Sequence, residues 1–305
     1  MDAPLAILLA LIGLAAACGV WGVFIERQLF VIRRDSVRVL PAGAQPIRVL
    51  HVADIHMAPW QGRKQRWLRS ALATEAYDLV VNTGDNLGHS AGIGPVLTAL
   101  KPALAHPGVF VNGSNDYYSP VFRNPLAYTW RNSERSHGHP LETTRMTGAF
   151  EHAGWRNLNN RGSVVEINGM RIGFVGVDDA HDGLAKLETL PDQITSNGSV
   201  DVTIGVTHAP YLNVVRAMAD AGAPLVFAGH THGGQVCVPG IGALTTNSDL
   251  PVSLAKGVSV WNHQGRSAFL NVSAGIGTSI FAPVRFACPP EAVLVTLRAR
   301  DFGYS

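Results

Sequence analysis

Cysteine and net charge are both scarce in this chain of 305 residues. The three cysteines, Cys18, Cys237 and Cys288, are odd in number and far apart. Their spacing excludes a disulfide framework and a cysteine-based zinc cluster. The 24 basic and 22 acidic side chains leave a formal net charge of +2, and no basic tract stands out. We therefore expect no nucleic-acid partner.

Charge is also missing from a long segment near the N-terminus, Pro4 to Ile25. About 22 residues at about 1.5 Å each span roughly 33 Å, which is enough for a bilayer core of about 30 Å. A signal peptide normally begins with a basic region, and the only charged side chain before this run is Asp2. Ala15–Cys18 faintly matches a lipoprotein cleavage site, but the apolar run continues through Phe24. We predict a transmembrane anchor over residues 1–26.

Basic residues follow this anchor but do not precede it. Arg27, Arg33 and Arg34 lie just after the apolar run. Because positive flanks stay on the cytoplasmic side, we expect a single-pass protein of the cell membrane whose main domain is cytoplasmic. Free cysteines are compatible with that side.

Apolar runs alternate with amphipathic segments through the first half of the chain. Residues 27–45 are expected to form a juxtamembrane strand and linker. Further strands are expected at residues 46–56, 77–86 and 108–116, with helices at residues 63–76 and 93–105 between them. The strands are nearly all apolar, as in a sheet covered on both faces, and each ends in Asp, His or Asn. This α/β pattern predicts that ligands bind at the carboxyl ends of the strands.

The second half repeats this pattern. Asn168-Gly169 predicts the type I′ turn of a hairpin, and later strands end at His208 and at His230 and His232. Between the halves, about residues 117–150 mix proline, arginine and aromatic residues without a period. An insert of this length is expected to be a lid, a binding loop or a surface insert. We predict one domain of two packed sheets over residues 46–300.

Ten polar residues stand at or near the predicted strand ends. They are Asp54, His56, Asp85, Asn86, Ser114, Asn115, Asp116, His208, His230 and His232. A single such residue is more often a cap or a turn former. Together, carboxylates and imidazoles suit Mn²⁺, Fe or Zn²⁺. The set is large enough for two ions with one shared carboxylate, and two ions about 4 Å apart suit in-line displacement at phosphorus by a locally generated hydroxide.

Five of these motifs carry a resemblance to a known family. In order, they are "DIH" from Asp54, "GDN" from Gly84, "GSND" from Gly113, "THAP" around His208 and "GHTHGGQ" from Gly229. Over residues 47–236 the chain resembles the calcineurin-like metallophosphoesterases. The segment from Asn271 to Leu297 is similar to the C-terminus of the membrane-anchored, YkuE-like branch of that superfamily.

The resemblance implies a four-layer αββα fold around a dinuclear metal centre. It implies that Asp54, His56 and His232 hold one ion, that Asp85 bridges, and that His208 and His230 hold the second. The "GSND" turn would add one further ligand. The residues expected to take part in catalysis are Asp85, Asn115 and His208.

The "GSND" turn departs from the pattern of this family. Ser114 stands where the family has a metal-binding Asn, and Asn115 stands where it has a His that assists the leaving group. An amide oxygen is the better metal ligand, so Asn115 is expected to bind the metal, with Ser114 as the alternative. The general acid is missing from its usual place. The candidate substitutes are His89, His181 and His263.

Two functions remain open at this point. The first is a membrane-tethered phosphoesterase that hydrolyses a phosphodiester, a phosphomonoester or a pyrophosphate, with a lipid-linked substrate favoured by the anchor. The second is a metal-binding sensor whose turnover is reduced by the altered "GSND" turn.

Overall fold

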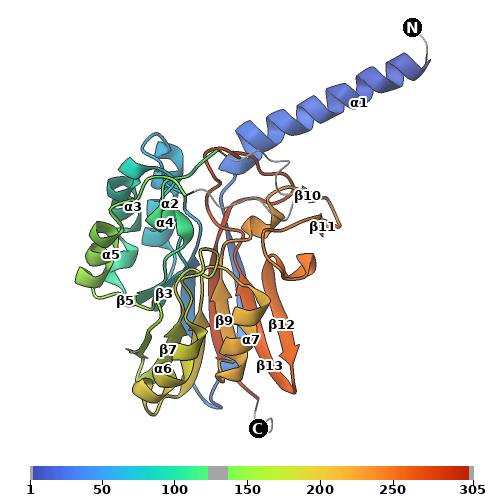
Figure 1. The fold of residues 1–305 in the computed structure, drawn as a ribbon. Helices are drawn as coiled ribbons and strands as arrows, with labels where there is room; N and C mark the ends of the chain where they lie inside the picture. The colour runs from blue at the N-terminus through green and yellow to red at the C-terminus, as the bar shows by residue number, and fades with distance from the viewer. Residues whose placement is uncertain (1–2, 123–136, 302–305) are drawn as a thin grey trace.

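Two six-stranded sheets pack face to face, and helices cover the outer face of each (Figure 1). The computed structural model describes residues 3–122 and 137–301. The layers run helix, sheet, sheet, helix, so the expected four-layer αββα fold is confirmed.

The first sheet has the strand order β1-β14-β2-β3-β4-β5. Its bounds are β1 (Val31–Leu40), β14 (Glu291–Ala299), β2 (Ile47–Val52), β3 (Leu79–Asn82), β4 (Gly108–Phe110) and β5 (Arg156–Asn157). On its outer face lie α2 (Gly62–Thr74), α3 (Ile93–Leu100) and α5 (Thr143–His152). Strand β1 pairs in parallel with β14 along its whole length, so the juxtamembrane residues contribute an edge strand to the domain.

The second sheet has the order β12-β13-β9-β8-β7-β6. Its bounds are β12 (Gly257–His263), β13 (Arg266–Val272), β9 (Leu225–Ala228), β8 (Val202–Val206), β7 (Met170–Gly176) and β6 (Gly162–Ile167). Its outer face carries α6 (Leu190–Asn197) and α7 (Leu212–Asp220). Asn168 and Gly169 both have positive φ in the β6–β7 hairpin, as a type I′ turn requires.

The core between the sheets is built from the alternate side chains of both. Val49 and Val81 from the first sheet belong to one buried cluster with Phe174, Ile204 and Phe227 from the second. Strands β2, β3 and β9 are buried on both faces, because helices cover the side that faces away from this core. Sheet and core together give the strand-end loops a rigid base.

Part of the expected insert is regular structure. Residues 114–117 form α4 (Ser114–Tyr117), and α5 begins at Thr143. Met146 and Phe150, four residues apart on one face of α5, are fully buried, which explains why this segment is a helix rather than a loop. The middle of the insert, residues 123–136, lies outside the described residues.

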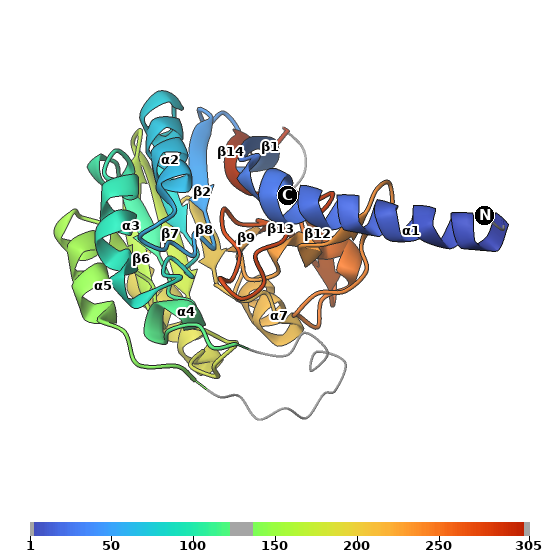
Figure 2. The ribbon, with the colours of Figure 1, turned by 90° about the horizontal axis from the view of Figure 1, so that it is seen from above.

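The N-terminal helix α1 (Ala3–Val20) projects from one end of the sandwich, and none of its residues is buried (Figures 1 and 2). It continues through the short helical turns η1 (Trp21–Ile25) and η2 (Glu26–Gln28). The whole segment, Ala3–Gln28, has a mean hydropathy of 2.4 in its most apolar window and is long enough to cross a membrane.

A small hairpin lies near the same end, formed by β10 (Cys237–Val238) and β11 (Gly242–Ala243). Short 3-10 turns complete the described structure: η3 (Ser90–Gly92), η4 (Ala103–Ala105), η6 (Leu187–Thr189), η7 (His232–Gly234) and η8 (Val252–Leu254).

Candidate metal centre

The candidate ligands come from loops at the carboxyl ends of strands in both sheets. Asp54 and His56 follow β2, and Asp85 follows β3. From the second sheet, His208 follows β8, while His230 and His232 follow β9. The parallel strands β2 and β3, and likewise β8 and β9, deliver their ends to the same edge. All six Asp and His residues predicted as metal ligands therefore meet at one edge of the sandwich.

The backbone at this edge is unusually strained. Asp54, His56, Asp85, His230 and His232 all have φ between 42° and 68°. This left-handed region is costly for residues that carry a Cβ, and such outliers gather at functional sites. The surrounding glycines make the tight turns possible. A Cβ on Gly113, for example, would lie 2.3 Å from Asp85 Oδ1 and 2.7 Å from the ring of His208.

One group of possible ligand atoms belongs to Asp54, His56 and His232, which lie within 4.8 Å of one another. The Nε2 atoms of His56 and His232 are 3.2 Å apart. His232 Nε2 is 3.8 Å from Asp54 Oδ1. This is the triad that the resemblance assigned to the first ion.

A second group overlaps the first and consists of Asp54, Asp85 and His208. His208 Nε2 lies 3.6 Å from Asp85 Oδ2 and 3.2 Å from His230 Nδ1. On its other side, His208 Nδ1 lies 2.8 Å from the carbonyl oxygen of Thr83. If the N–H is on Nδ1 it donates to this carbonyl, which leaves the Nε2 lone pair for a metal ion.

Charge and burial at this edge suit a cation. Burial lowers the pKa of His56 to about 4 and takes the pKa values of His230 and His232 well below the ordinary value. These imidazoles are neutral and can donate lone pairs. Burial also raises the pKa of Asp54 to about 7, with nearby Asp85 acting in the same direction. Two buried carboxylates beside neutral imidazoles form the donor set that a divalent ion satisfies.

His208 and Asp85 interact most strongly. Burial would lower the pKa of His208, but the charges of Asp85 and Asp179 outweigh it and raise the pKa to about 9, so a metal ion would displace the Nε2 proton on binding. For Asp85, burial is opposed by His208, His56 and the bonds from Asn115, and its pKa is lowered. Asp85 is thus the carboxylate that stays ionised at the centre of the cluster.

Asn115 lies in the site, and it faces Asp85. Its backbone N–H donates to Asp85 Oδ1 at 2.8 Å, and its side-chain Nδ2 donates to Asp85 Oδ2 at 2.8 Å. In this arrangement the amide holds the central carboxylate by its nitrogen, whereas the sequence led us to expect a metal ligand through its oxygen. Ser114 is half-buried at the start of α4, where its carbonyl accepts the N–H of Tyr118.

Asp116 and Asn86, two further strand-end residues, hold the turns together. Asp116 is fully buried and accepts backbone N–H groups of Asn86, Leu87 and Gly113. The Asn86 side chain in turn bonds to Asp116 and to Asn82. These residues join the "GDN" and "GSND" turns and so position Asp85 and Asn115.

Of the three substitute histidines, only His181 lies beside the ligand cluster. Its ring centroid is 4.5 Å from that of His230, and its Nδ1 is 2.7 Å from the hydroxyl of Tyr211. His89 caps the turn at Ala91. His263 is at the tip of the β12–β13 hairpin, where it pairs with Arg266.

Sequence reasoning missed Arg285, which is fully buried behind His232. Its Nη2 donates to the carbonyl oxygens of Ala274 and Gly277, both at 2.6 Å, and lies 3.3 Å from His232 Nδ1. The guanidinium thereby joins the loop after β13 to the loop that carries His232. The sequence feature that could have pointed to Arg285 is its place as a single arginine in the mostly apolar segment 280–295.

Cys237 and Cys288 are free thiols buried at the same loop. Their sulfur atoms lie 3.2 Å and 3.6 Å from the carbonyl oxygen of Gly233.

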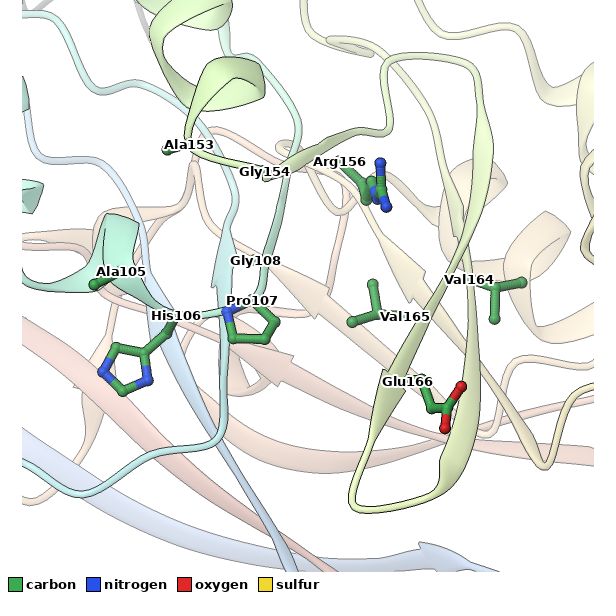
Figure 3. Close-up of a pocket in the computed structure, with 10 residues that line it drawn as sticks. All are labelled: Ala105, His106, Pro107, Gly108, Ala153, Gly154, Arg156, Val164, Val165 and Glu166. Atoms are coloured by element: carbon green, nitrogen blue, oxygen red, sulfur yellow. The ribbon is translucent and has the colours of Figure 1, made fainter.

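A separate cavity of about 390 Å³ lies away from this edge. It is lined by residues around the start of β4 and by β6, with His106, Arg156 and Glu166 among them (Figure 3). Since it contains none of the residues of the two ligand groups, it is not the site of metal chemistry.

The comparisons with known proteins agree with this geometry. The model of the family described as calcineurin-like phosphoesterase matches residues 47–234. An uncharacterized metallophosphoesterase of Aquifex aeolicus (strain VF5) is 24% identical over 282 residues, which cover 91% of this chain and 93% of the relative. The uncharacterized protein YpbG of Bacillus subtilis (strain 168) is 27% identical over 255 residues, covering 84% and 82%.

Among solved structures, the protein TT1561 of Thermus thermophilus shares 13% identity at a TM-score of 0.46, over 76% of this chain and 91% of that one. The family model covers more than half of the chain, and it contains the candidate ligands from Asp54 to His232. The chain therefore belongs to the calcineurin-like phosphoesterase family and is a metal-dependent phosphoester hydrolase.

Proposed function

We propose that this protein is a membrane-tethered phosphoesterase that works with two metal ions. The observation that carries the proposal is the position of Asp85 between two groups of imidazoles. Its Oδ2 lies 3.4 Å from His56 Nε2 and 3.6 Å from His208 Nε2. A carboxylate oxygen shared in this way suits two neighbouring ions better than one.

Each ligand then has a role. Asp54, His56 and His232 would hold the first ion, His208 and His230 would hold the second, and Asp85 would be shared. The donor set suits Mn²⁺, Fe or Zn²⁺. When bound, the ions supply water activation at neutral pH and neutralise charge on the phosphoryl oxygens. His208 keeps Nε2 turned to the site through its contact with Thr83, and Asn115 holds Asp85 in place by two hydrogen bonds.

The substrate class follows from the altered turn. A positioned general acid contributes about 10²- to 10⁴-fold, mostly when the leaving group is poor. Asn115 cannot donate a proton in this way. We therefore propose pyrophosphates and aryl phosphoesters as better substrates than alkyl monoesters.

The membrane tether is supported by how α1 joins the domain. Its residues are exposed and apolar, whereas Gly22 and Glu26 just after it are buried. The carbonyl of Gly22 accepts the N–H of Arg285, and Glu26 Oε1 accepts the N–H of Cys288 at 2.7 Å. The anchor thus ends against the loop behind the candidate ligands. This favours a phosphoester carried by a membrane lipid. The arginines after the anchor favour a cytoplasmic domain, and the similarity of the segment from Asn271 to Leu297 favours the YkuE-like branch.

The second candidate is a metal-binding sensor with reduced turnover, and the Ser114-Asn115 pair is the observation in its favour. The full chain in detergent, titrated with Mn²⁺ and assayed on bis-p-nitrophenyl phosphate, separates the two. We expect two bound ions and metal-dependent hydrolysis, both impaired in Asp85→Asn. Asp220→Asn, at an exposed carboxylate on α7, is the matched control. Two bound ions without hydrolysis over a panel of phosphoesters would identify a sensor.

A further inference from the structure

We infer that exposed apolar side chains beside the anchor form a second membrane contact that rests on the lipid surface. The inference rests on the proposed membrane tether. The contact, here called the apolar rim, consists of Val236, Ile241 and Leu244 on and around the β10–β11 hairpin, and Phe122 and Phe281 from two loops next to it.

The rim residues are large, apolar and exposed. Ile241 is 76% exposed and Leu244 is 67% exposed, although they lie in a hairpin of only two short strands. Phe122 and Phe281 are also exposed, and their rings contact each other with centroids 5.8 Å apart. Single exposed apolar residues are ordinary, but several on one hairpin and on the loop bonded to it mark a candidate interaction surface.

Hydrogen bonds tie the rim to the end of the anchor. Gln235 Nε2 donates to the carbonyl of Ala282 at 2.7 Å, which joins the start of the hairpin to the loop of Phe281. Cys237 N donates to the carbonyl of Phe286 at 2.8 Å. The neighbouring residue, Arg285, donates its N–H to the carbonyl of Gly22 in the last turns of the anchor at 3.1 Å.

The direction of the anchor decides what covers the rim. In Figure 1 the hairpin of β10 and β11 lies on the side of the domain toward which α1 projects. If α1 crosses the bilayer, its 18 residues at about 1.5 Å each leave Trp21 and Phe24 at the interface, where aromatic side chains are favoured. The hairpin is bonded to Phe286, the residue after Arg285, and Arg285 is bonded to Gly22. The hairpin then meets the headgroup region of the same leaflet. A lipid surface is thus the occupant that this geometry selects.

The position of the rim also places the candidate metal ligands near the membrane. The turn η7, which begins with His232, runs directly into Val236 and β10. Contact of the rim with lipid would therefore hold the catalytic edge against the leaflet, where a lipid-borne phosphoester is presented. A small soluble phosphoester gains nothing from this contact.

Depth measurements on the full chain test the contact itself. Ile241→Cys in a Cys18→Ser background is labelled with an environment-sensitive fluorophore and placed in phosphatidylcholine nanodiscs that contain a nitroxide-labelled lipid. Gln264→Cys, at the exposed tip of the β12–β13 hairpin, is the matched control. We expect strong quenching at position 241 and weak quenching at 264. Equally weak quenching at both overturns the inference, as does protection of position 241 by a second copy of the chain.

Activity measurements test whether contact of the apolar rim with lipid favours the hydrolysis of a lipid-borne phosphoester. The double substitution Ile241→Ser and Leu244→Ser is expected to lower hydrolysis of a long-chain alkyl p-nitrophenyl phosphate in vesicles by about tenfold, because two large apolar side chains lose their burial in lipid. Hydrolysis of bis-p-nitrophenyl phosphate should stay unchanged. Val260→Ser, at an exposed apolar residue of β12, is the control.

The outcomes separate the two proposals. Equal loss on both substrates points to a folding role and overturns the inference, and so does no loss on either. If the unmodified protein hydrolyses neither substrate, the proposed function fails, while the quenching experiment still decides whether the rim contacts lipid.

Discussion

At the scale of single residues, we expect Asn115 to set the preference of this enzyme among phosphoesters. Its two hydrogen bonds to Asp85 hold the central carboxylate, and this is a positioning role. The histidine that the family pattern has at this position is absent, and His181 lies beside His230 instead of beside this turn. Substitutions at the turn can therefore separate metal binding from help to the leaving group.

Restoring the family pattern at the "GSND" turn tests whether the missing histidine limits the cleavage of poor leaving groups. Ser114→Asn combined with Asn115→His should raise turnover of an alkyl phosphoester by about tenfold or more, and that of an activated aryl ester far less. The ratio of the two rates is measured together with metal content. A single Asn115→His change should help less, because it removes the amide that holds Asp85 without adding an amide at position 114. No selective gain with two ions still bound would mean that another group supplies the proton.

Arg285 provides a second prediction at this scale. Arg285→Met should weaken Mn²⁺ binding by about 10- to 100-fold, because the loop that carries His232 loses its connection to Ala274 and Gly277. Arg285→Lys keeps the charge but has fewer donors in fixed directions, so an intermediate loss is expected. Binding is measured by calorimetry on the folded protein. Unchanged affinity with a lower melting temperature would assign Arg285 a purely structural role.

At the scale of elements, the junction between the N-terminal helix and the domain is a packed contact. The turn η1 packs closely on the loop of Arg285: a Cβ on Gly22 would lie 2.8 Å from the carbonyl oxygen of Arg285. Glu26 is buried there and accepts hydrogen bonds from Trp21 and Cys288. The N-terminal helix is therefore joined to the domain by a fixed contact and not by a free linker.

Gly22→Ala tests whether this junction stabilises the domain. The added methyl group should cost on the order of 1 kcal/mol and lower the melting temperature of the full chain in detergent by about 2–4 °C. Gly13→Ala is the matched control, since nothing lies within 4 Å of a Cβ at that position of the anchor. Equal melting temperatures for both variants would show that the junction does not contribute to stability.

At the scale of the whole molecule, two separate sheets build one candidate metal centre. Asp54, His56 and Asp85 follow strands of the first sheet, and His208, His230 and His232 follow strands of the second. Ions bound between them would join the two halves of the sandwich and should make its stability depend on metal concentration.

Removing metal tests this coupling. Addition of Mn²⁺ at about 100 times its dissociation constant should stabilise the full chain by about 2.7 kcal/mol for each site, and a chelator should reverse the effect. The shift in melting temperature should be much smaller in Asp85→Asn, and Asp220→Asn should behave as the unmodified protein. A shift of equal size in Asp85→Asn would exclude this residue as a ligand.

Topology is the other property of the whole molecule. The arginines after the anchor predict a cytoplasmic domain. A reporter fused after Ser305 should be active only as a cytoplasmic protein, and protease added to intact cells should leave the domain whole. Cleavage from outside would reverse the orientation without affecting the chemistry.

The order of amino acids was enough to predict the family, the alternation of strands and helices, and the six Asp and His residues that gather at the strand ends. These features depend on residues that are neighbours in the sequence, because an apolar run that ends in Asp or His predicts both a strand and the loop that follows it. The folded chain was needed to show how Asn115 faces Asp85, that His181 rather than His89 or His263 lies beside the ligands, and that Arg285 supports His232. Those contacts join residues far apart in the chain, and no local pattern specifies the distance between such side chains. The same holds for the edge strand β1 and for α5, whose places were set by pairing with β14 and by the burial of Phe150.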